Sequence, residues 1–308
     1  MTPIHAEQPR GAVRIGCCGF PVSRQRYYEA FRVVEVDSSF YQPPRQATAE
    51  RWRREAPTGF QFTVKAWQLV THPPTSPTYR KLGADRPERL DRCGHFKRSP
   101  EVRLAWERTR RLARTLRAQI VLFQTPMSLR PDADKLRDLY AFFETVERGE
   151  FLLAWEPRGP AWTEKLVARV LADLDLVHAA DPLALQYPGR PGPPASTAPP
   201  AAHTFPEGAG DARPPASTAP PAAHTFPEGA GDARPPASTA PLAVAPSGRM
   251  GYFRLHGTYR EGRRVYRHRY SDEELKILAR LCRFRPTFVF FNNSEMFDDA
   301  RRFAETVA

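Results

Sequence analysis

The segment VEVDSSFYQPPRQATAERW, residues 34–52, contains a strand pattern, a polar cluster and a helix pattern in direct succession. Its valines suit a strand, and Asp37, two serines and Tyr41 follow them before two prolines interrupt the chain and a helical pattern begins. Alternation along the strand places Glu35 and Asp37 on one face and the valines on the other. Valines pack well against helices, so we expect both carboxylates to point to the opposite side of the sheet.

The same succession of strand and helix recurs along the chain. The predicted strands are 12–17, 33–37, 60–66, 119–124, 151–156, 175–181, 251–257 and 287–292. The predicted helices are 24–30, 46–55, 100–117, 131–147, 161–173, 271–282 and 293–307. Eight strands that alternate with helices predict an α/β fold, a TIM-type (β/α)8-like parallel barrel into which Glu35 and Asp37 would point. A doubly wound sheet has the same alternation, but no GxGxxG turn follows any strand.

A tandem repeat interrupts this pattern between the sixth and seventh strands. The sequence PPASTAPPAAHTFPEGAGDAR occupies 193–213 and recurs unchanged at 214–234. With one Phe per copy, it buries too little apolar surface to offset the entropy lost on ordering. The predicted organisation is a flexible N-terminus (1–12), a single barrel domain (13–186 and 249–308) and a disordered low-complexity insertion (187–248).

The composition is basic. Lys and Arg number 46 against 34 Asp and Glu, for a net charge of +12. This excess favours an anionic partner, with nucleic acid the leading candidate, although a GC-rich coding bias toward Arg is the alternative. No apolar run is long enough to span a membrane, and the N-terminus lacks a signal-peptide pattern, so we expect a cytoplasmic protein without a membrane partner. Its oligomeric state is left open.

Every predicted strand ends in polar or reactive side chains. In a parallel barrel these ends gather on one rim, which carries the active site. The candidate catalytic residues are Glu156, Asp181 and His256. The candidate ligand-binding residues are Asp37, Ser38, Tyr41, Lys65, His72, Gln124, Arg158, Arg254 and Asn292.

The chemistry of these groups leaves several alternatives. Glu156 and Asp181 suit a general acid/base pair, but Glu156 would equally suit an ion pair with Lys65 or Arg158 inside the barrel. His256 suits a base, a phosphate donor, a metal ligand or a structural residue. A divalent metal would find donors among these side chains and Asp37, yet no HExxH or CxxC spacing supports a metal site. The cofactor is therefore left open.

A basic and aromatic stretch follows the seventh predicted strand. In GYFRLHGTYREGRRVYRHRY, residues 251–270, arginines alternate with tyrosines. Guanidinium groups neutralise phosphates and aromatic faces stack on bases, so this stretch indicates a phosphate or nucleic-acid contact. A solvated basic loop is the alternative.

Several motifs, in this order, carry a resemblance to a known family. They are Val34–Tyr41, Phe62–Ala66 followed by Thr71-His72, Leu122–Pro126, Glu156-Pro157-Arg158, Arg254–Gly257 and Phe291–Asn293. The chain resembles the YecE-like family, domain of unknown function 72. The resemblance implies a barrel fold and no settled reaction. It departs from the family pattern at Cys17-Cys18, at Asp37 in place of Asn, and at Gly159 in place of the usual His after Arg158, which weakens a metal or catalytic role at the fifth strand.

Our leading hypothesis is a barrel whose polar, basic pocket binds a phosphate-bearing small molecule or nucleic acid, with phosphoester hydrolysis as the candidate reaction. Lys65, Arg158, Arg254 and His256 would hold the anion, and Glu156 or Asp181 would activate water, with or without a metal. One alternative is a non-catalytic nucleic-acid or anion-binding module. Another is a sugar- or metabolite-processing barrel that uses the two carboxylates.

Overall fold

Eight parallel strands form the centre of the molecule, as predicted. The computed structural model describes residues 12–83, 86–183, 250–260, 263–283 and 285–308. The predicted N-terminal segment, apart from Ala12, and the predicted insertion lie outside these residues. The strands are β1 (Val13–Cys17), β2 (Val33–Val36), β3 (Gln61–Lys65), β4 (Ile120–Gln124), β5 (Leu152–Glu156), β6 (Val177–Ala180), β7 (Gly251–Leu255) and β10 (Thr287–Phe291).

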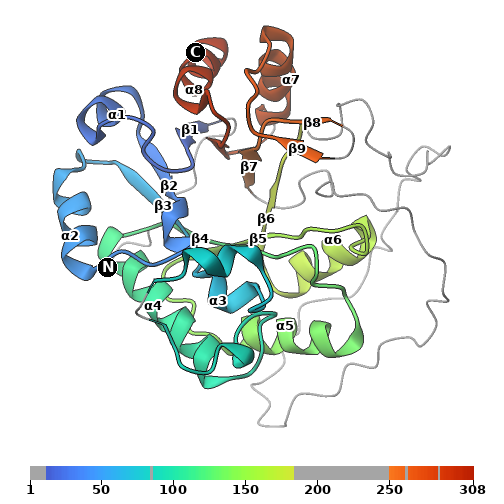
Figure 1. Ribbon diagram of the computed structural model, residues 1–308. Helices are drawn as coiled ribbons and strands as arrows, with labels where there is room; N and C mark the ends of the chain where they lie inside the picture. The colour runs from blue at the N-terminus through green and yellow to red at the C-terminus, as the bar shows by residue number, and fades with distance from the viewer. Residues whose placement is uncertain (1–11, 84–85, 184–249, 261–262, 284) are drawn as a thin grey trace, which may run out of the picture. The chain divides into compact units, whose positions relative to one another are not determined.

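Helices surround the strands (Figure 1). They are α1 (Arg24–Ala30), α2 (Gln46–Glu55), α3 (Gln68–Thr71), α4 (Pro100–Leu116), α5 (Ala133–Thr145), α6 (Glu164–Asp173), α7 (Asp272–Cys282) and α8 (Met296–Val307). Short 3-10 helices cover η1 (Asp37–Phe40), η2 (Pro77–Lys81) and η3 (Leu90–Arg92), and a two-stranded hairpin joins β8 (Thr258–Arg260) to β9 (Arg263–Val265). In the part of the chain that the structure describes, no helix is both long and apolar enough to cross a bilayer.

The sheet closes into a barrel between its first two strands. The strand order is β1-β10-β7-β6-β5-β4-β3-β2, and β1 meets β2 at the parallel bridge between Cys18 and Glu35. Tyr27 of α1 fastens this seam, because its hydroxyl accepts from the N–H of Cys17 (2.8 Å) and donates to the carbonyl of Val33 (2.9 Å). Gly16 makes the approach possible, since a Cβ there would lie 2.3 Å from the Val33 oxygen.

Alternation along the strands sorts the barrel interior into an apolar and a polar layer. The apolar layer lies toward the amino-terminal ends and contains Val33, Ile120, Leu122, Ala154, Ala179, Tyr252, Phe288 and Phe290. Residues two positions further along the same strands, including Glu35, Gln124, Glu156, Asp181 and Arg254, form the polar layer. The interior is therefore packed rather than hollow, and its charged groups meet at the carboxyl-terminal end.

The segment that opened the sequence analysis folds as a strand that ends one residue early. β2 stops at Val36, and Asp37–Phe40 form the turn η1 instead of continuing the strand. The hydroxyl of Ser39 lies 2.6 Å from the carbonyl oxygens of Val36 and Lys65, which ties the turn to β3. This turn leaves Asp37 at the end of the barrel.

The predicted seventh strand is also too long, because Gly257 turns the chain after β7. Gly257 has φ of 86°, and a Cβ there would lie 2.3 Å from the carbonyl oxygen of Val265. The β8–β9 hairpin, which was not predicted, packs back against this turn. Only glycine tolerates both the positive φ and the close approach.

A capping box formed by residues 271–274 is present at the start of α7. Ser271 Oγ accepts from the N–H of Glu274 (3.2 Å), and Glu274 Oε2 accepts from the N–H of Ser271 (2.7 Å). Replacing Ser271 with alanine is expected to lower the free energy of unfolding by about 1 kcal/mol, measured by urea denaturation. Ser23→Ala is the matched control, since Ser23 occupies the N-cap of α1 without a capping hydrogen bond. Equal losses in both variants would contradict the assignment.

Candidate functional site

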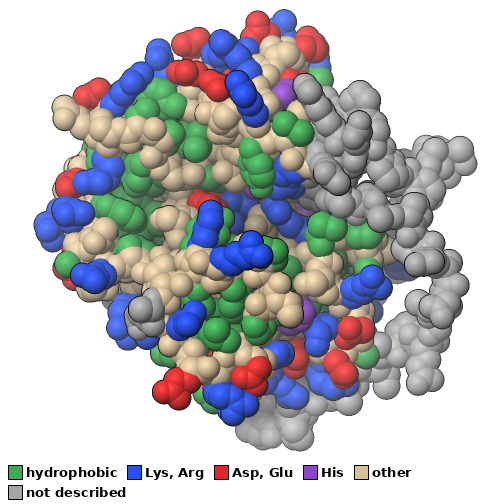
Figure 2. Space-filling model, viewed as in Figure 1, with side chains coloured by type: hydrophobic (Ala, Val, Ile, Leu, Met, Phe, Trp, Pro, Cys, Tyr) green, Lys and Arg blue, Asp and Glu red, His purple; other side chains and the backbone are tan. Residues whose placement is uncertain are grey.

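The predicted site residues lie at one end of the barrel, which we call the mouth: the carboxyl-terminal ends of the parallel strands and the loops that follow them. The face shown in Figures 1 and 2 carries α3 and the β8–β9 hairpin, which follow β3 and β7. Figure 2 shows Lys and Arg side chains gathered around a hollow near the middle of this face. The charged groups of the mouth form the buried ion network, defined as Glu35, Asp37, Lys65, Glu156, Arg158 and Arg254.

Arg254 is the centre of this network and is completely buried. It donates to Glu35 twice, from Nε to Oε2 (3.0 Å) and from Nη2 to Oε1 (2.7 Å). Nη2 also donates to Asp37 Oδ1 (3.0 Å), and Nη1 donates to Glu156 Oε2 (2.6 Å) and lies 3.4 Å from His256 Nε2. Each of the three guanidinium nitrogens of Arg254 thus has a partner inside the protein. Its predicted contact with an anion would require one of these bonds to break.

Glu156 receives hydrogen bonds on both carboxylate oxygens. Arg158 donates to Oε1 from Nε (2.9 Å) and Nη2 (2.7 Å), while Gln124 Nε2 (2.8 Å) and Arg254 donate to Oε2. Burial alone would raise the pKa of Glu156, but Arg158 and Arg254 outweigh burial and hold this pKa well below its ordinary value. Glu156 therefore stays ionised and is a weak proton acceptor near neutral pH.

Asp37 and Lys65 form a further ion pair of the mouth. Lys65 Nζ donates to Asp37 Oδ1 (3.0 Å) and lies 4.2 Å from the ring centroid of Phe40. Burial would raise the pKa of Asp37, but Lys65 and Arg254 together hold it below its ordinary value. The network therefore contains three cations and three carboxylates, and its charges balance.

His256 is neutral and buried between the arginines. Its Nε2 lies 3.3 Å from Arg158 Nη2, and its Nδ1 lies 3.0 Å from Asn292 Nδ2, so the tautomer depends on the orientation of this amide. Burial, and after it the positive charges of Arg264 and Arg254, hold the pKa of His256 well below its ordinary value. The ring can accept or share a hydrogen bond, but it does not carry charge at neutral pH.

Asp181 is a carboxylate of the mouth whose pKa is raised rather than lowered. Its two oxygens accept from the backbone N–H groups of Leu183 and His256, each at 3.2 Å. The side chain is almost fully buried, and burial raises the pKa of Asp181 to about 6, although the nearby Arg264 opposes this shift. Asp181 is therefore able to gain or lose a proton close to neutral pH.

The remaining predicted residues lie around the network. Ser38 is exposed at the rim, and Tyr41 is half-buried beside it. His72 is buried, its Nδ1 is 2.8 Å from Thr71 Oγ1, and its ring packs edge-on against Phe40. Burial, then Lys65 and Arg158, lower the pKa of His72 to about 3. All these side chains surround one end of the barrel, but only part of the predicted set is directly bonded together.

The basic and aromatic stretch at 251–270 divides into buried and exposed parts. Tyr252 is buried inside the barrel, where it donates to Glu35 Oε2 (2.7 Å), and Tyr270 is buried against Gly257. Tyr266 is 50% exposed, with Arg264 beside its ring. The side chains of Tyr259, Arg260 and Arg263 lie outside the described part of the molecule. Among the tyrosines of this stretch whose side chains the structure describes, Tyr266 is exposed to solvent, whereas Tyr252 and Tyr270 are buried.

The positions of the His, Cys, Asp and Glu side chains can be compared with the requirements of a metal site. Among the described residues, no group of three His, Cys, Asp or Glu side chains is placed to hold a metal ion. Between Glu35, Asp37 and Glu156, the position where a cation would sit is taken by the Arg254 guanidinium. A metal in this place would have to displace that arginine.

Glu35 was not among the predicted site residues, and Arg264 and Tyr266 were predicted only as members of the basic and aromatic stretch at 251–270. The strand alternation does indicate that Glu35 points into the barrel, and the structure confirms this by its bonds to Arg254 and Tyr252. Arg264 and Tyr266 reach the mouth only because the β8–β9 hairpin turns back at Gly257.

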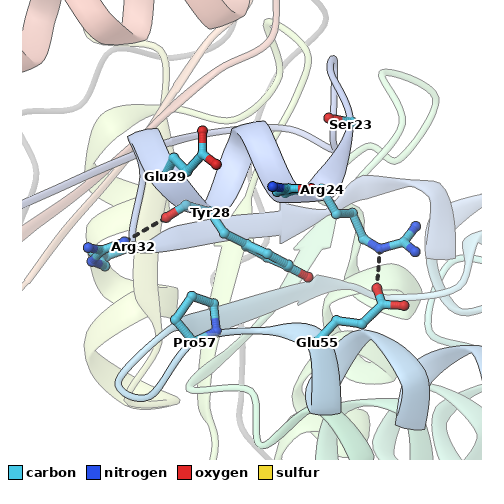
Figure 3. Close-up of a pocket in the computed structure, with 8 residues that line it drawn as sticks. Ser23, Arg24, Tyr28, Glu29, Arg32, Glu55 and Pro57 are labelled. Atoms are coloured by element: carbon cyan, nitrogen blue, oxygen red, sulfur yellow. Dashed lines mark hydrogen bonds and ion pairs between the residues drawn. The ribbon is translucent and has the colours of Figure 1, made fainter.

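A second hollow lies away from the mouth, on the outer side of the barrel (Figure 3). This open groove of about 830 Å³ is lined by α1, the loop after it, the end of α2 and Pro57. Arg24 Nε donates to Glu55 Oε2 across it (2.6 Å), and Arg32 Nη1 donates to the carbonyl of Tyr28 (2.6 Å). None of the predicted site residues lines this groove.

The fold and the mouth define a class of protein: a parallel α/β barrel with a buried ion network at the carboxyl-terminal ends of its strands. The chain belongs to the family described as "Protein of unknown function DUF72", whose model matches residues 23–308. This confirms the resemblance seen in the strand-end motifs.

Individual relatives agree with this assignment. The UPF0759 protein YunF of Bacillus subtilis (strain 168) is 45% identical over 47 residues, which are 15% of this chain and 17% of that protein. The crystal structure of a DUF72 family protein from Enterococcus faecalis V583 has a TM-score of 0.61 at 16% identity, over 96% of this chain and 97% of that one. A DUF72 family protein from Thermotoga maritima MSB8 has a TM-score of 0.58 at 20% identity, over 96% and 99% of the two chains. At these identities the two structures establish the shared fold.

Proposed function

We propose that this protein binds a small phosphate-bearing ligand at the mouth of the barrel. The proposal rests on the exposure and the hydrogen bonds of Arg158. Its side chain is 21% exposed, and Glu156 fixes Nε and Nη2 through a single carboxylate oxygen. Nη1 makes no hydrogen bond to any other residue within the described ranges. A guanidinium that is held in place and keeps free N–H groups is pre-organised for phosphate oxygens.

Neighbouring groups support the same ligand. Burial lowers the pKa of Arg158, and the positive charges of Arg264 and Arg254 act in the same direction, although Glu156 opposes them. An anion bound among these guanidinium groups would relieve their mutual repulsion. Asn292, which is half-exposed beside His256, offers an amide for orientation.

Inorganic phosphate binding, measured by titration calorimetry, tests the proposal. Arg158→Gln is expected to weaken binding roughly ten- to hundredfold, the loss that follows from removing a hydrogen bond to a charged group. Arg158→Lys keeps a positive charge near Glu156 and is the second variant in case the first folds poorly. Arg111→Gln, at an exposed position on α4, is the control. Wild-type affinity in both Arg158 variants would overturn the proposal.

Phosphoester hydrolysis is the second candidate function, and the environment of Asp181 favours it. With a pKa of about 6, Asp181 can take a proton from water at neutral pH, whereas the pKa of Glu156 is held too low for that role. In this scheme water attacks phosphorus while its proton passes to an Asp181 oxygen, and the P–O bond to the leaving oxygen breaks. The leaving alkoxide takes a proton from solvent to become the alcohol, and Asp181 then releases its proton to solvent. A turnover rate that is unchanged by Asp181→Asn, or that does not rise with pH through about 6, would exclude this role. A non-catalytic anion site predicts binding without turnover.

A further inference from the structure

Two tyrosines from distant parts of the chain border the mouth. Tyr41 follows η1, and its carbonyl oxygen accepts from Trp67 Nε1 (3.1 Å) and Gln68 Nε2 (3.3 Å). Tyr266 follows β9, and its carbonyl oxygen accepts from the N–H groups of His268 (2.9 Å) and Ser294 (3.0 Å). Both backbones are therefore fixed, while the ring of Tyr41 is half-buried and that of Tyr266 is 50% exposed.

A cation lies beside each of these rings. Lys81 Nζ is 4.6 Å from the ring centroid of Tyr41, and Arg264 Cζ is 6.0 Å from that of Tyr266. Such contacts orient both the ring and the cation. Aromatic surface and positive charge thus occur as two pairs at the mouth, the combination that binds bases by stacking and phosphates by charge.

The two tyrosines share one electrostatic environment with the ion network. Burial raises the pKa of Tyr41, and the nearby Asp37 and Tyr266 raise it further. The ring of His256 packs edge-on against Tyr266 at 6.4 Å, and His256 Nε2 is in turn 3.3 Å from Arg158 Nη2. A continuous line of contacts therefore runs from the exposed ring of Tyr266 to the guanidinium proposed to hold the phosphate.

We propose that Tyr41 and Tyr266 form an aromatic clamp for the planar base of a nucleoside phosphate, whose phosphate group binds Arg158. This inference rests on the proposed function and narrows its ligand class. The two kinds of residue make different contacts. The tyrosines supply flat apolar surface for the base, and Arg158 supplies the directional donors for the phosphate. A sugar phosphate without a base would make only the contact between its phosphate and Arg158.

Titration calorimetry with four probes tests the clamp: adenosine monophosphate, ribose 5-phosphate, adenosine and inorganic phosphate. Adenosine monophosphate is expected to bind about tenfold or more tightly than ribose 5-phosphate, since stacking of a base on an aromatic side chain contributes an increment of that order. Tyr266→Ala and Tyr41→Ala should remove this difference, so that each variant binds adenosine monophosphate and ribose 5-phosphate with equal affinity. Tyr266→Phe should keep it, because the ring is retained.

The outcomes separate the clamp from the phosphate site. Leu104→Ala, at an exposed apolar position on α4, is the control and should bind all probes like the wild type. Equal affinities for adenosine monophosphate and ribose 5-phosphate, or wild-type selectivity in both alanine variants, would overturn the clamp and leave the phosphate site standing. Adenosine binding as tightly as its monophosphate, with loss in the tyrosine variants, would support the clamp and overturn the phosphate site. Binding of none of the probes would overturn both.

Discussion

Arg254→Met is expected to lower the free energy of unfolding by about 3–5 kcal/mol, the loss seen when one partner of a buried ion pair is removed. The substitution leaves Glu35, which is completely buried, without a cation, while Glu156 keeps only Arg158 and Asp37 keeps only Lys65. Methionine is close to arginine in length, so the loss reports uncompensated charge more than lost volume. Urea denaturation of the two proteins at neutral pH measures it.

Two further measurements identify the cause of this loss. Arg111→Met, an exposed position on α4, should change stability by less than about 0.5 kcal/mol. The double variant Arg254→Met with Glu35→Met should recover part of the loss, because it removes the carboxylate that the single variant leaves without a cation. If Arg254→Met costs less than about 1 kcal/mol, the buried ion network is not a coupled unit.

Asp181→Asn is expected to change the pH dependence of stability by up to about 3 kcal/mol. The pKa of Asp181 is about 6 in the folded protein and 3.8 by its ordinary value, a difference of about two units at 1.36 kcal/mol each. Because the folded pKa is the higher one, folding is favoured by the protonated form. This contribution is fully present below pH 4 and is lost as the pH rises through 6. The variant cannot ionise, so its stability relative to the wild type should rise between pH 4 and pH 8.

The sign of this effect distinguishes Asp181 from the paired carboxylates. The pKa values of Glu156 and Asp37 are held below their ordinary values, so their contribution is present above about pH 4.5 and is lost as the pH falls. Losing one acceptor oxygen in Asp181→Asn costs about 1 kcal/mol at every pH and does not alter the slope. Denaturation midpoints at pH 4, 6 and 8, with Asp298→Asn as the exposed control on α8, make the comparison. If the difference in stability between wild type and variant does not change with pH, the pKa of Asp181 is not raised.

The pattern of the strands was readable in the sequence because it depends on short-range rules. In residues 34–37 valine alternates with a carboxylate at a period of two, which predicts both the strand and the inward direction of Glu35, and the structure confirms both. Repeating this unit eight times indicates a barrel, since parallel strands joined by helices bring their carboxyl ends together. The predicted strand boundaries were less accurate where a side chain at the end of a strand bonds to a neighbouring strand. Ser39, which reaches the carbonyl of Lys65 on β3, ends β2 one residue before the prediction.

What only the tertiary structure decided is which charges pair. The sequence places cations and carboxylates at the strand ends but says nothing about distances between side chains more than two hundred residues apart, such as Arg254 and Glu35. Closure of the barrel puts Arg254 among three carboxylates and engages all of its donors inside the protein, while Arg158 at the rim keeps part of its guanidinium free. The β8–β9 hairpin, turned back at Gly257, brings Tyr266 against His256 at this rim. Local alternation sets the direction of a side chain, but its partner, its burial and hence its pKa depend on how the eight strands close.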